Sequence, residues 1–480
     1  MKPIDESLLQ DALAYIDRWV EFRQRTLRVP GVAIAIRHRD RTVLSRAYGL
    51  ADVAHGVPLT KGHIFRIASH SKTFTATAVM QLVERGALRL DDRAGDRLPW
   101  LPAGPGEIGR VTLQQLLSHS AGVIRDGENG GFWQVEREFP GPDELRDALA
   151  STPLVVPANV RFKYSNFGYS LLGMVVEAAS GLPYNTYVRR HVVEPLGLRD
   201  TGPELDDHAR AHLATGYTGD YYGLERLAVV HQETGAMSPA TGFYSTAEDM
   251  CRYFAAHFLG SDELLTDESR REMQREHWKA EGTPMSYGLG FDVSHLGERR
   301  LVGHGGGFPG FITNTKIDPV QQLAVVALTN SGDGPAAELV GGMLAIIDRA
   351  QRAEPAPPDR DGLDRFTGRF WSIAGPTDVV RFGGELLAIV PHLPNALDTA
   401  SVLAAAGSDE LTISSAIGFR SPGERVRYAF DGEGRVERVQ LAASVLYPWD
   451  TFERAILPGM RETGRVSPPP RHRPDGYAFV

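Results

Sequence analysis

The sequence contains very little cysteine. Among its 480 residues only Cys251 is a cysteine, so no disulfide can form within the chain, and this fits a reducing compartment. Residues 1–27 have the pattern of an amphipathic helix with many charges, which leaves no apolar core for a secretory signal. No stretch is apolar for long enough to span a bilayer. We therefore expect a cytoplasmic protein without a membrane partner.

Concentrated positive charge is also lacking. Lysine and arginine together number 51 against 60 aspartates and glutamates, a net charge of −9, without a basic run or an acidic tail. This distribution argues against a nucleic acid or an anionic lipid surface as partner. The length and the hydrophobic content of 42% are those of a globular protein with two or three domains. A small molecule is the expected partner, and the sequence leaves open whether the chain forms a homo-oligomer.

Several motifs of other enzyme classes are absent. The sequence has no Gly-x-Ser-x-Gly elbow of an α/β-hydrolase and no Walker-type phosphate loop. Gly305–Gly310 fits the bare dinucleotide pattern, but it leads into a strand instead of opening a helix that could hold phosphate. His208 and His212 have a spacing found at metal sites, but the glutamate of an H-E-x-x-H motif is missing. We expect neither a cofactor nor a metal.

Hydrophobic periodicity predicts strands at the start of the chain, helices in its centre, and strands followed by a helix after that. The strands are predicted at 31–38, 42–49, 301–303, 311–317 and 322–328, and the helices at 69–85, 112–117, 167–179, 246–258 and 336–349. Both ends of this region must then complete one sheet, which predicts an α+β or α/β sandwich.

The composition changes at about residue 351. Residues 1–350 form the predicted first domain, and the charged, proline-rich stretch 351–362 is the predicted linker. In 363–462 short apolar runs alternate with glycine and aspartate turns, which predicts a small all-β domain resembling a barrel. Residues 463–480 contain several prolines and are expected to be extended or disordered.

Only one of the six lysines, Lys72, has a serine three residues before it. At the start of a helix these two positions share a face, so the Ser69 hydroxyl and the Lys72 amine can approach each other. The helix N-terminus and the Ser69 N–H would stabilise an oxyanion, and burial would lower the pKa of the lysine until it can accept the hydroxyl proton. Taken alone, the pair is equally compatible with a serine cap and a solvated lysine.

Two other segments could complete such a site. Tyr164 and Asn166 form a Tyr-x-Asn motif, in which the tyrosine can shuttle a proton if nearby cations favour its phenolate and the asparagine can orient substrate and lysine. His304 precedes Gly305–Gly307, where glycines on a strand let a ligand come close and the Gly307 N–H would be a second oxyanion donor. In isolation these segments would be a packed tyrosine with a capping asparagine, and a turn with a surface histidine.

The three motifs together resemble the serine β-lactamase-like superfamily, and most closely its class C β-lactamase, D-aminopeptidase and esterase branch. The residues that carry this resemblance, in order, are Ser69-His70-Ser71-Lys72, Tyr164-Ser165-Asn166 and His304-Gly305-Gly306, with supporting stretches at 116–122, 213–217 and 242–250. It covers about residues 10–350. The resemblance implies a mainly antiparallel sheet flanked by helices, an all-helical lobe, and an active site between the two.

The resemblance also implies roles for the individual residues. Ser69 is the implied nucleophile, Lys72 and Tyr164 the acid/base pair, and Asn166 the orienting residue. His304 stands where penicillin-binding relatives have the lysine of Lys-Thr-Gly, whose cation holds a substrate carboxylate. An ordinary histidine is mostly neutral at pH 7 and is a weaker anchor for such a group.

We therefore predict hydrolysis of an amide, peptide or ester through an acyl-enzyme on Ser69, as in D-aminopeptidases or esterases. The alternatives are a β-lactamase or D-Ala carboxypeptidase activity, and an acylated sensor that does not turn over. Substrate contacts are predicted for His70, Gly305, Gly306, Tyr221 and Tyr222.

Overall fold

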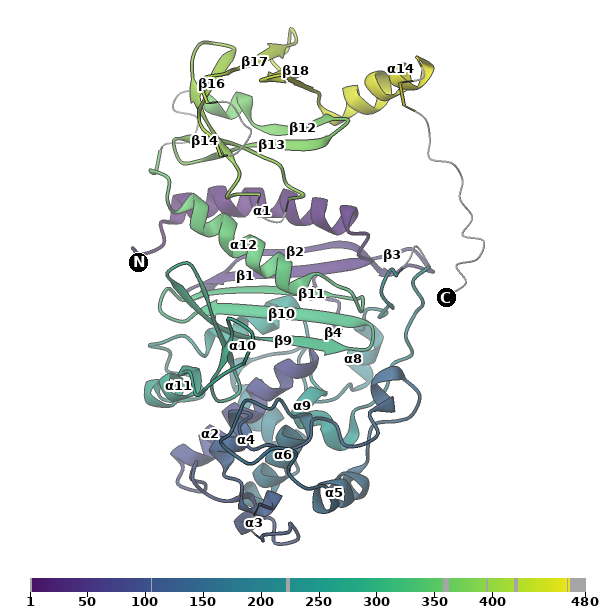
Figure 1. Ribbon diagram of the computed structural model, residues 1–480, viewed down its shortest axis with the longest axis vertical. Helices are drawn as coiled ribbons and strands as arrows, with labels where there is room; N and C mark the ends of the chain where they lie inside the picture. The colour runs from purple at the N-terminus through teal and green to yellow at the C-terminus, as the bar shows by residue number, and fades with distance from the viewer. Residues whose placement is uncertain are drawn as a thin grey trace. The chain divides into compact units, whose positions relative to one another are not determined.

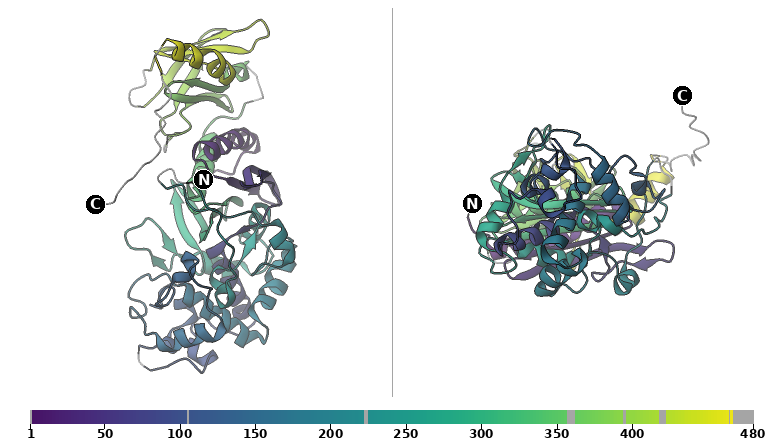
Figure 2. Two further views of the ribbon diagram at one scale, coloured as in Figure 1. Left: turned by 90° about the vertical axis from the view of Figure 1, so that its right-hand side faces the viewer. Right: turned by 90° about the horizontal axis from the view of Figure 1, so that it is seen from below.

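The computed structural model describes residues 2–104, 106–221, 225–356, 362–393, 396–417, 422–463 and 465–466 (Figure 1). Of the predicted linker and tail, residues 357–361, 464 and 467–480 lie outside this description. The chain divides into two units, which consist of Met1–Pro3 with Val20–Leu344 and of Ile4–Trp19 with Ala345–Val480. Two helices, α1 (Glu6–Thr26) and α12 (Ala336–Ala350), contribute residues to both units, and Figure 2 follows them from two further directions.

The first unit contains a nine-stranded antiparallel sheet of order β3-β2-β1-β11-β10-β9-β8-β7-β6. Its strands are β1 (Gly31–His38), β2 (Arg41–Asp52), β3 (Val57–Pro58), β6 (Trp278–Lys279), β7 (Ser286–Tyr287), β8 (Asp292–Leu296), β9 (Arg299–Phe308), β10 (Phe311–Asp318) and β11 (Leu323–Thr329). β1 pairs with both β2 and β11, so the two ends of the unit complete one sheet as the sequence predicts. Both β1 and β11 are buried almost throughout, as expected for strands covered on both faces.

Helices of the central part of the chain lie beside β9, except α10, which packs against β1 and β11 of the sheet (Figure 1). They are α2 (Ser71–Glu84), α3 (Ala94–Arg97), α4 (Leu113–Leu117), α5 (Pro142–Ser151), α6 (Asn166–Ser180), α7 (Tyr184–Val188), α8 (Asp207–His212), α9 (Ser238–Thr241), α10 (Ala247–Ala255) and α11 (Asp267–Gln274). Shorter helical turns are η1 (Ala68–His70), η2 (Ile108–Arg110), η3 (Gly131–Gln134), η4 (Arg189–Val193), η5 (Glu194–Leu196) and η6 (Gly235–Met237), and a two-stranded sheet joins β4 (Phe65–Arg66) to β5 (Tyr244–Ser245). α2 packs against α6 and α9.

β9 extends further than its apolar residues predict. The sequence indicates a strand at 301–303, whereas β9 runs from Arg299 to Phe308 and contains four glycines. Glycine has a low strand propensity, but continuous pairing with β10 from Val302 to Phe308 keeps this segment extended. The segment around His304 is therefore a strand and not a turn.

The second unit is built around an eight-stranded antiparallel sheet in sequence order. Its elements are η7 (Leu363–Phe366), β12 (Gly368–Ser372), β13 (Gly375–Phe382), β14 (Glu385–Ile389), β15 (Ser401–Ala405), β16 (Glu410–Ser415), β17 (Arg425–Phe430), β18 (Val436–Leu441), β19 (Ser444–Leu446), α13 (Trp449–Thr451), η8 (Phe452–Ile456) and α14 (Leu457–Glu462). A bridge between Trp371 and Tyr447 brings the first and last strands together, so the sheet is nearly closed, like a barrel.

The first part of α1 belongs to this second unit. The Tyr15 hydroxyl donates to Asp378 Oδ2 at 3.0 Å, and the Trp19 indole N–H donates to the Pro391 carbonyl at 3.3 Å. Tyr15 is only 2% exposed, so this contact ties the helix to the interior of the unit.

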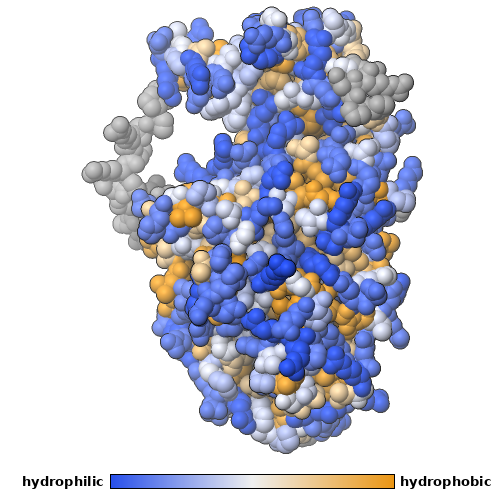
Figure 3. Space-filling view, turned by 180° about the vertical axis from the view of Figure 1, so that it is seen from behind, coloured by the Kyte–Doolittle hydropathy of each residue, from blue (hydrophilic) through white to orange (hydrophobic). Residues whose placement is uncertain are grey.

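Within the described ranges, no helix combines the length and the apolar character needed to cross a bilayer. On the face drawn in Figure 3, hydrophilic side chains are interspersed with hydrophobic ones.

Replacing Tyr15 with Phe tests the attachment of α1. The change removes the donor to a buried carboxylate, so we expect the free energy of unfolding of the second unit to fall by about 1–2 kcal/mol. Urea denaturation followed by tryptophan fluorescence measures the loss. Tyr447→Phe is the matched control, because its hydroxyl has no hydrogen-bond partner among the described residues, and equal losses in the two variants would contradict this role for Tyr15.

Candidate active site

Ser69 lies in the short turn η1, which continues into α2. The residue before it, Ala68, has φ of +48°, in the left-handed region that costs a residue with a Cβ about 1–2 kcal/mol. The turn is fixed from two sides, because the Ile67 N–H donates to the Phe243 carbonyl at 3.0 Å and Gly306 of β9 packs against the Ile67 carbonyl. Ser69 itself is half-buried, where the helical lobe meets the sheet.

Lys72 is completely buried beside this serine. Its Nζ lies 3.1 Å from Ser69 Oγ, 2.7 Å from Asn166 Oδ1 and 2.9 Å from the carbonyl oxygen of Ala240 in α9. Desolvation disfavours the charged form and holds the pKa of the Lys72 amine well below its usual value. The amine is therefore predisposed to lose its proton.

The neighbours of Lys72 fit a neutral amine. The Asn166 amide oxygen and the Ala240 carbonyl oxygen can only accept hydrogen bonds. A neutral amine has two N–H groups to donate to these two oxygens and one lone pair left, which the Ser69 hydroxyl can meet. The arrangement can thus act as a base toward the serine without leaving a buried polar group unpaired.

Tyr164 lies between the lysine and a buried histidine. Lys72 Nζ is 4.7 Å from the centroid of the Tyr164 ring, and the ring of His119 is 4.2 Å away on centroids. Burial raises the pKa of Tyr164 above its usual range, although its hydrogen bond with Ser69 and the charge of Arg125 act in the opposite direction. Tyr164 therefore keeps its proton in this structure, so the phenolate considered from the sequence is not the resting form.

Asn166 is the first residue of α6, and its amide orientation is fixed by two partners. Its Oδ1 accepts from Lys72 and its Nδ2 donates to Asp126 Oδ1 at 2.7 Å. Asp126 Oδ2 lies 3.1 Å from Arg125 Nε, and the Arg125 carbonyl accepts two backbone N–H groups at the start of α6. This loop therefore determines that the oxygen of the Asn166 amide faces the lysine.

His304 lies on β9 and is 5% exposed. Its Nδ1 donates to the Gly305 carbonyl at 2.6 Å, which leaves its Nε2 to accept from the Tyr287 hydroxyl at 2.9 Å. Burial, together with the nearby charge of Lys72, lowers the pKa of His304 to about 3. The imidazole is neutral near pH 7 and supplies no cation to hold a substrate carboxylate.

Gly307 has its backbone at an open strand edge. β9 turns into β10 through Pro309–Gly310, and Phe308 pairs with Phe311 at this two-residue turn. Because hydrogen-bonded and non-hydrogen-bonded pairs alternate in an antiparallel ladder, the backbone groups of Phe308 face β10 and those of Gly307 face away from it. On that side β8 pairs with β9 only up to Gly303. The exposed Gly307 can therefore present its N–H to a ligand.

The other predicted substrate contacts have different surroundings. Gly305 and Gly306 are both on β9, and Gly306 lies against the turn that holds Ser69. His70 is completely buried, its Nδ1 lies 2.9 Å from the Ile67 carbonyl and its Nε2 3.0 Å from Thr315 Oγ1, so its ring links η1 to β10. Tyr221 is 58% exposed, and Tyr222 lies outside the described residues.

The sequence did not predict the buried aromatic residues around Tyr164. His119 is 4.9 Å from Tyr169 and 4.7 Å from Tyr287 between ring centroids, and the Tyr169 hydroxyl donates to the Leu117 carbonyl at 2.5 Å. Asp126 was missed as well. Tyr169 lies in the helix that begins at Asn166, but Asp126 is 40 residues from Asn166 and Tyr287 is 17 residues from His304, so local spacing gives no signal that they meet.

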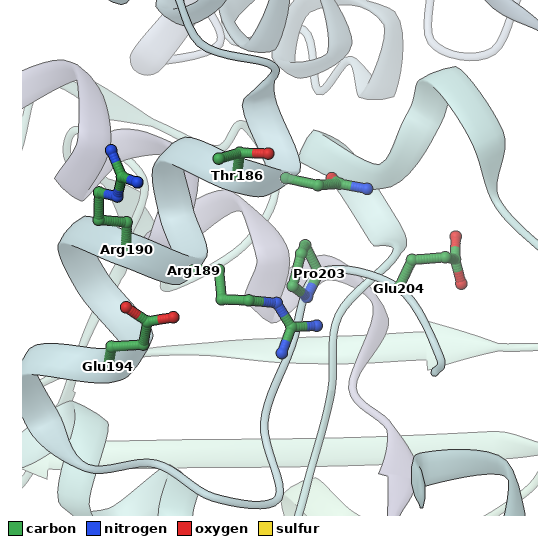
Figure 4. A pocket seen from close by; sticks show the side chains of 7 residues that line it. Thr186, Arg189, Arg190, Glu194, Pro203 and Glu204 are labelled. Atoms are coloured by element: carbon green, nitrogen blue, oxygen red, sulfur yellow. The ribbon is translucent and has the colours of Figure 1, made fainter. Parts of the chain in front are cut away.

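Two other features lie outside this site. Among the described residues no group of three or more His, Cys, Asp or Glu side chains could hold a metal, and His208 Nε2 instead lies 2.9 Å from Asp200 Oδ1. A pocket of about 310 Å³ is lined by Asn185, Thr186, Arg189, Arg190, Glu194, Pro203 and Glu204. In Figure 4 Arg189 and Glu204 lie on either side of Pro203. The pocket shares no residue with the surroundings of Ser69.

The family model described as Beta-lactamase matches residues 16–346 of this chain. The chain belongs to the beta-lactamase family. The resemblance inferred from the three motifs is thereby confirmed, and so is the predicted α+β fold with its antiparallel sheet and helical lobe.

This family member is similar to several known proteins. The chain is 24% identical over 334 residues to Protein flp of Staphylococcus aureus (strain MW2). The aligned region covers 67% of this chain and 64% of Protein flp, so the chain spans less than two thirds of that relative's length. An octameric penicillin-binding protein homologue from Pyrococcus abyssi aligns with a TM-score of 0.63 and 21% identity over 91% of this chain and 99% of that one. A D-stereospecific amidohydrolase from Streptomyces sp. aligns with a TM-score of 0.58 and 24% identity over 68% of this chain and 97% of that one. These structures share the fold.

Gly306→Ala tests the fixed position of the Ser69 turn. A Cβ at Gly306 would lie 2.2 Å from the Ile67 carbonyl oxygen, so η1 must move away from β9. We expect ester hydrolysis to fall by about 100-fold, since a displacement on the order of 1 Å misaligns the nucleophile. The control is Gly341→Ala, where a Cβ has no neighbour within 4 Å. Normal kcat/KM in a folded Gly306→Ala protein would show that this contact does not position the turn.

Proposed function

We propose that this chain is a serine hydrolase that cleaves an amide or ester through an acyl-enzyme on Ser69. The observation that carries the proposal is the environment of Lys72. Two neighbours of its buried amine, the Asn166 amide oxygen and the Ala240 carbonyl oxygen, can only accept hydrogen bonds, and the third is the Ser69 hydroxyl. A helix cap with a solvated lysine, the other interpretation of the Ser-x-x-Lys motif, does not account for a lysine with no exposed surface.

The proposed acylation step follows from these contacts. The Ser69 hydroxyl proton moves to Lys72 Nζ while Oγ forms a bond to the substrate carbonyl carbon. The negative charge on the carbonyl oxygen is held by the N–H groups of Ser69 and Gly307. Tyr164 gives its proton to the leaving amine or alkoxide as that bond breaks, and Tyr164 regains a proton from Lys72. In deacylation a water molecule gives a proton to Lys72 and forms a bond to the acyl carbon, the bond to Ser69 Oγ breaks, Oγ takes the proton of Tyr164, and Tyr164 regains one from Lys72.

The neutral His304 favours a D-aminopeptidase-like or esterase activity over a β-lactamase or D-Ala carboxypeptidase activity. A buried imidazole whose pKa is lowered to about 3 offers a carboxylate a hydrogen bond at most, and its Nδ1–H is already donated to Gly305. The similarity to a D-stereospecific amidohydrolase supports an amide substrate. By analogy with the octameric neighbour we also propose a homo-oligomer, and a cytoplasmic location stays a prediction.

Ser69→Ala is the direct test. We expect turnover of 4-nitrophenyl acetate and of D-aminoacyl 4-nitroanilides to fall by at least about 10³-fold, because among the described residues Ser69 has the only hydroxyl hydrogen-bonded to Lys72 Nζ. The control is Ser151→Ala, which removes an exposed hydroxyl at the end of α5 that donates to the Asp147 carbonyl at 2.7 Å, away from Ser69. Normal turnover by Ser69→Ala would refute the assignment.

The same assay separates the alternatives. Efficient nitrocefin hydrolysis, compared with the ester and the anilide, would favour the β-lactamase interpretation. Stable labelling of Ser69 by a fluorophosphonate probe and by slow substrates, without release of the acyl group, would favour the acylated sensor. Rapid release from the amide or ester supports the hydrolase.

The pH dependence tests Lys72 as the base. If the neutral amine accepts the serine proton, kcat/KM for a neutral ester falls as the pH drops through the lowered pKa of Lys72. The carboxylate of Asp126 raises this pKa, so Asp126→Asn should move the acidic limb of the profile to lower pH. Asp143→Asn, a change at an exposed carboxylate in the first turn of α5, is the control. An acidic limb that moves to higher pH, or does not move, would contradict this role for Lys72.

A further inference from the structure

We propose that the guanidinium of Arg125 binds an anionic group of the substrate, which makes Arg125 a specificity-determining residue of this site. The inference rests on the proposed hydrolase function and adds a substrate class to it: amides or esters that carry a carboxylate or a similar anion near the scissile bond. It starts from the charges that surround Ser69.

Several basic side chains near Ser69 do not provide a free positive charge. Lys72 tends toward the neutral form, and His304 is neutral and already hydrogen-bonded through both ring nitrogens. Lys316, on the strand next to β9, is paired with Asp292. Arg125 differs from all three, because an arginine stays protonated at any working pH and its side chain is 63% exposed.

The position of Arg125 is fixed by its backbone. Its carbonyl accepts the N–H groups of Asn166 and Phe167 at 2.9 and 3.1 Å, at the first turn of α6. Its Cζ lies 5.5 Å from the centroid of the Tyr164 ring, the ring that is also 4.7 Å from Lys72 Nζ. The cation is therefore held next to the residues that face Ser69.

One edge of the guanidinium remains available. Arg125 Nε lies 3.1 Å from Asp126 Oδ2, while its two terminal nitrogens have no partner among the described residues. Asp126 is poorly placed to accept hydrogen bonds from these terminal nitrogens, because its Oδ1 already accepts from Asn166 at 2.7 Å and its side chain is only 14% exposed. Two parallel N–H groups in one plane match the two oxygens of a carboxylate.

Asp126 orients two side chains, one through each of its carboxylate oxygens. Through Oδ1 it orients Asn166, which faces Lys72, and through Oδ2 it orients the guanidinium. An anion bound by Arg125 would compete with Asp126 only for the Nε edge and would leave Asn166 in place. The binding group and the base are thus adjacent but separately supported.

The test uses matched substrates that differ only in charge. The first pair is mono-4-nitrophenyl glutarate and its methyl ester, with the carboxylate in the acyl group. The second is 4-carboxyphenyl acetate and its methyl ester, with the carboxylate in the leaving group. We expect the wild-type protein to prefer the anionic member of at least one pair by about tenfold in kcat/KM, and Arg125→Gln to abolish this preference. Arg125→Lys should retain part of it, because lysine keeps the charge but not the planar fork.

Lys163→Gln is the matched control, since it removes a neighbouring cation that has no ion-pair partner among the described residues. This variant should keep the preference, whereas an equal loss in Lys163→Gln and Arg125→Gln would mean a general field effect and would overturn the proposal. The neutral ester also serves as an internal standard, because any effect of Arg125 on Lys72 changes both members of a pair alike.

The outcomes distinguish this inference from the proposed function. If the wild-type protein hydrolyses none of these esters and no amide, the hydrolase proposal fails. If it hydrolyses the neutral esters as well as the anionic ones, the hydrolase stands and the role of Arg125 is refuted. A preference that persists in Arg125→Gln likewise refutes it.

Discussion

The removal of the Lys72 amino group from water is the constraint on which the site depends. A charged ammonium would be costly in this interior, so the amine is stable there only with partners for its N–H groups and a tendency to be neutral. Asn166 and Ala240 meet the first requirement, and they come from two different helices, α6 and α9. α2 must therefore pack between these helices before the serine and the lysine can act together.

Neutral groups are a common property of the residues around Ser69. Burial pushes the pKa of Tyr164 upward and those of His304 and His70 downward, and each shift favours an uncharged side chain. In such surroundings a negative charge that develops on a substrate oxygen interacts strongly with nearby backbone dipoles, since little water screens them. Two N–H groups on a rigid turn and a rigid strand are well suited to this task.

The sequence predicts the parts of this architecture that depend on local pattern. Alternating apolar residues identify β1, β2, β10 and β11, and the Ser-x-x-Lys spacing identifies a pair whose atoms prove to be 3.1 Å apart. In the second unit the apolar runs at 378–382, 386–390, 410–413, 425–430 and 436–441 predict β13, β14, β16, β17 and β18, while β12, β15 and β19 were not recognised. These three strands are five residues long or shorter and are rich in glycine, alanine or serine.

The remaining features depend on contacts between distant segments. The glycines of β9 give no sign that they continue a strand, because only pairing with β10 keeps them extended. Asp126 and His119 are separated by 40 and 45 residues of sequence from Asn166 and Tyr164, respectively, and η3 and α5 lie in between. The stretch 116–122, which contains His119, supports the family resemblance but does not indicate that His119 contacts Tyr164. A pattern in one segment cannot report which residue of another segment will be its neighbour.

The division of α1 has a consequence for the synthesis of the chain. Ile4–Trp19 is made well before its partners in the second unit, because Asp378, which accepts from Tyr15, is translated more than 350 residues later. At a rate of about 5–20 residues per second this delay is on the order of tens of seconds. During that interval the apolar side chains of the half-helix have no native surface to cover them on the ribosome. The first unit can begin to fold while Ile4–Trp19, which belongs to the second unit, still lacks its native partners. A chaperone that covers these apolar side chains would help the nascent chain at this stage.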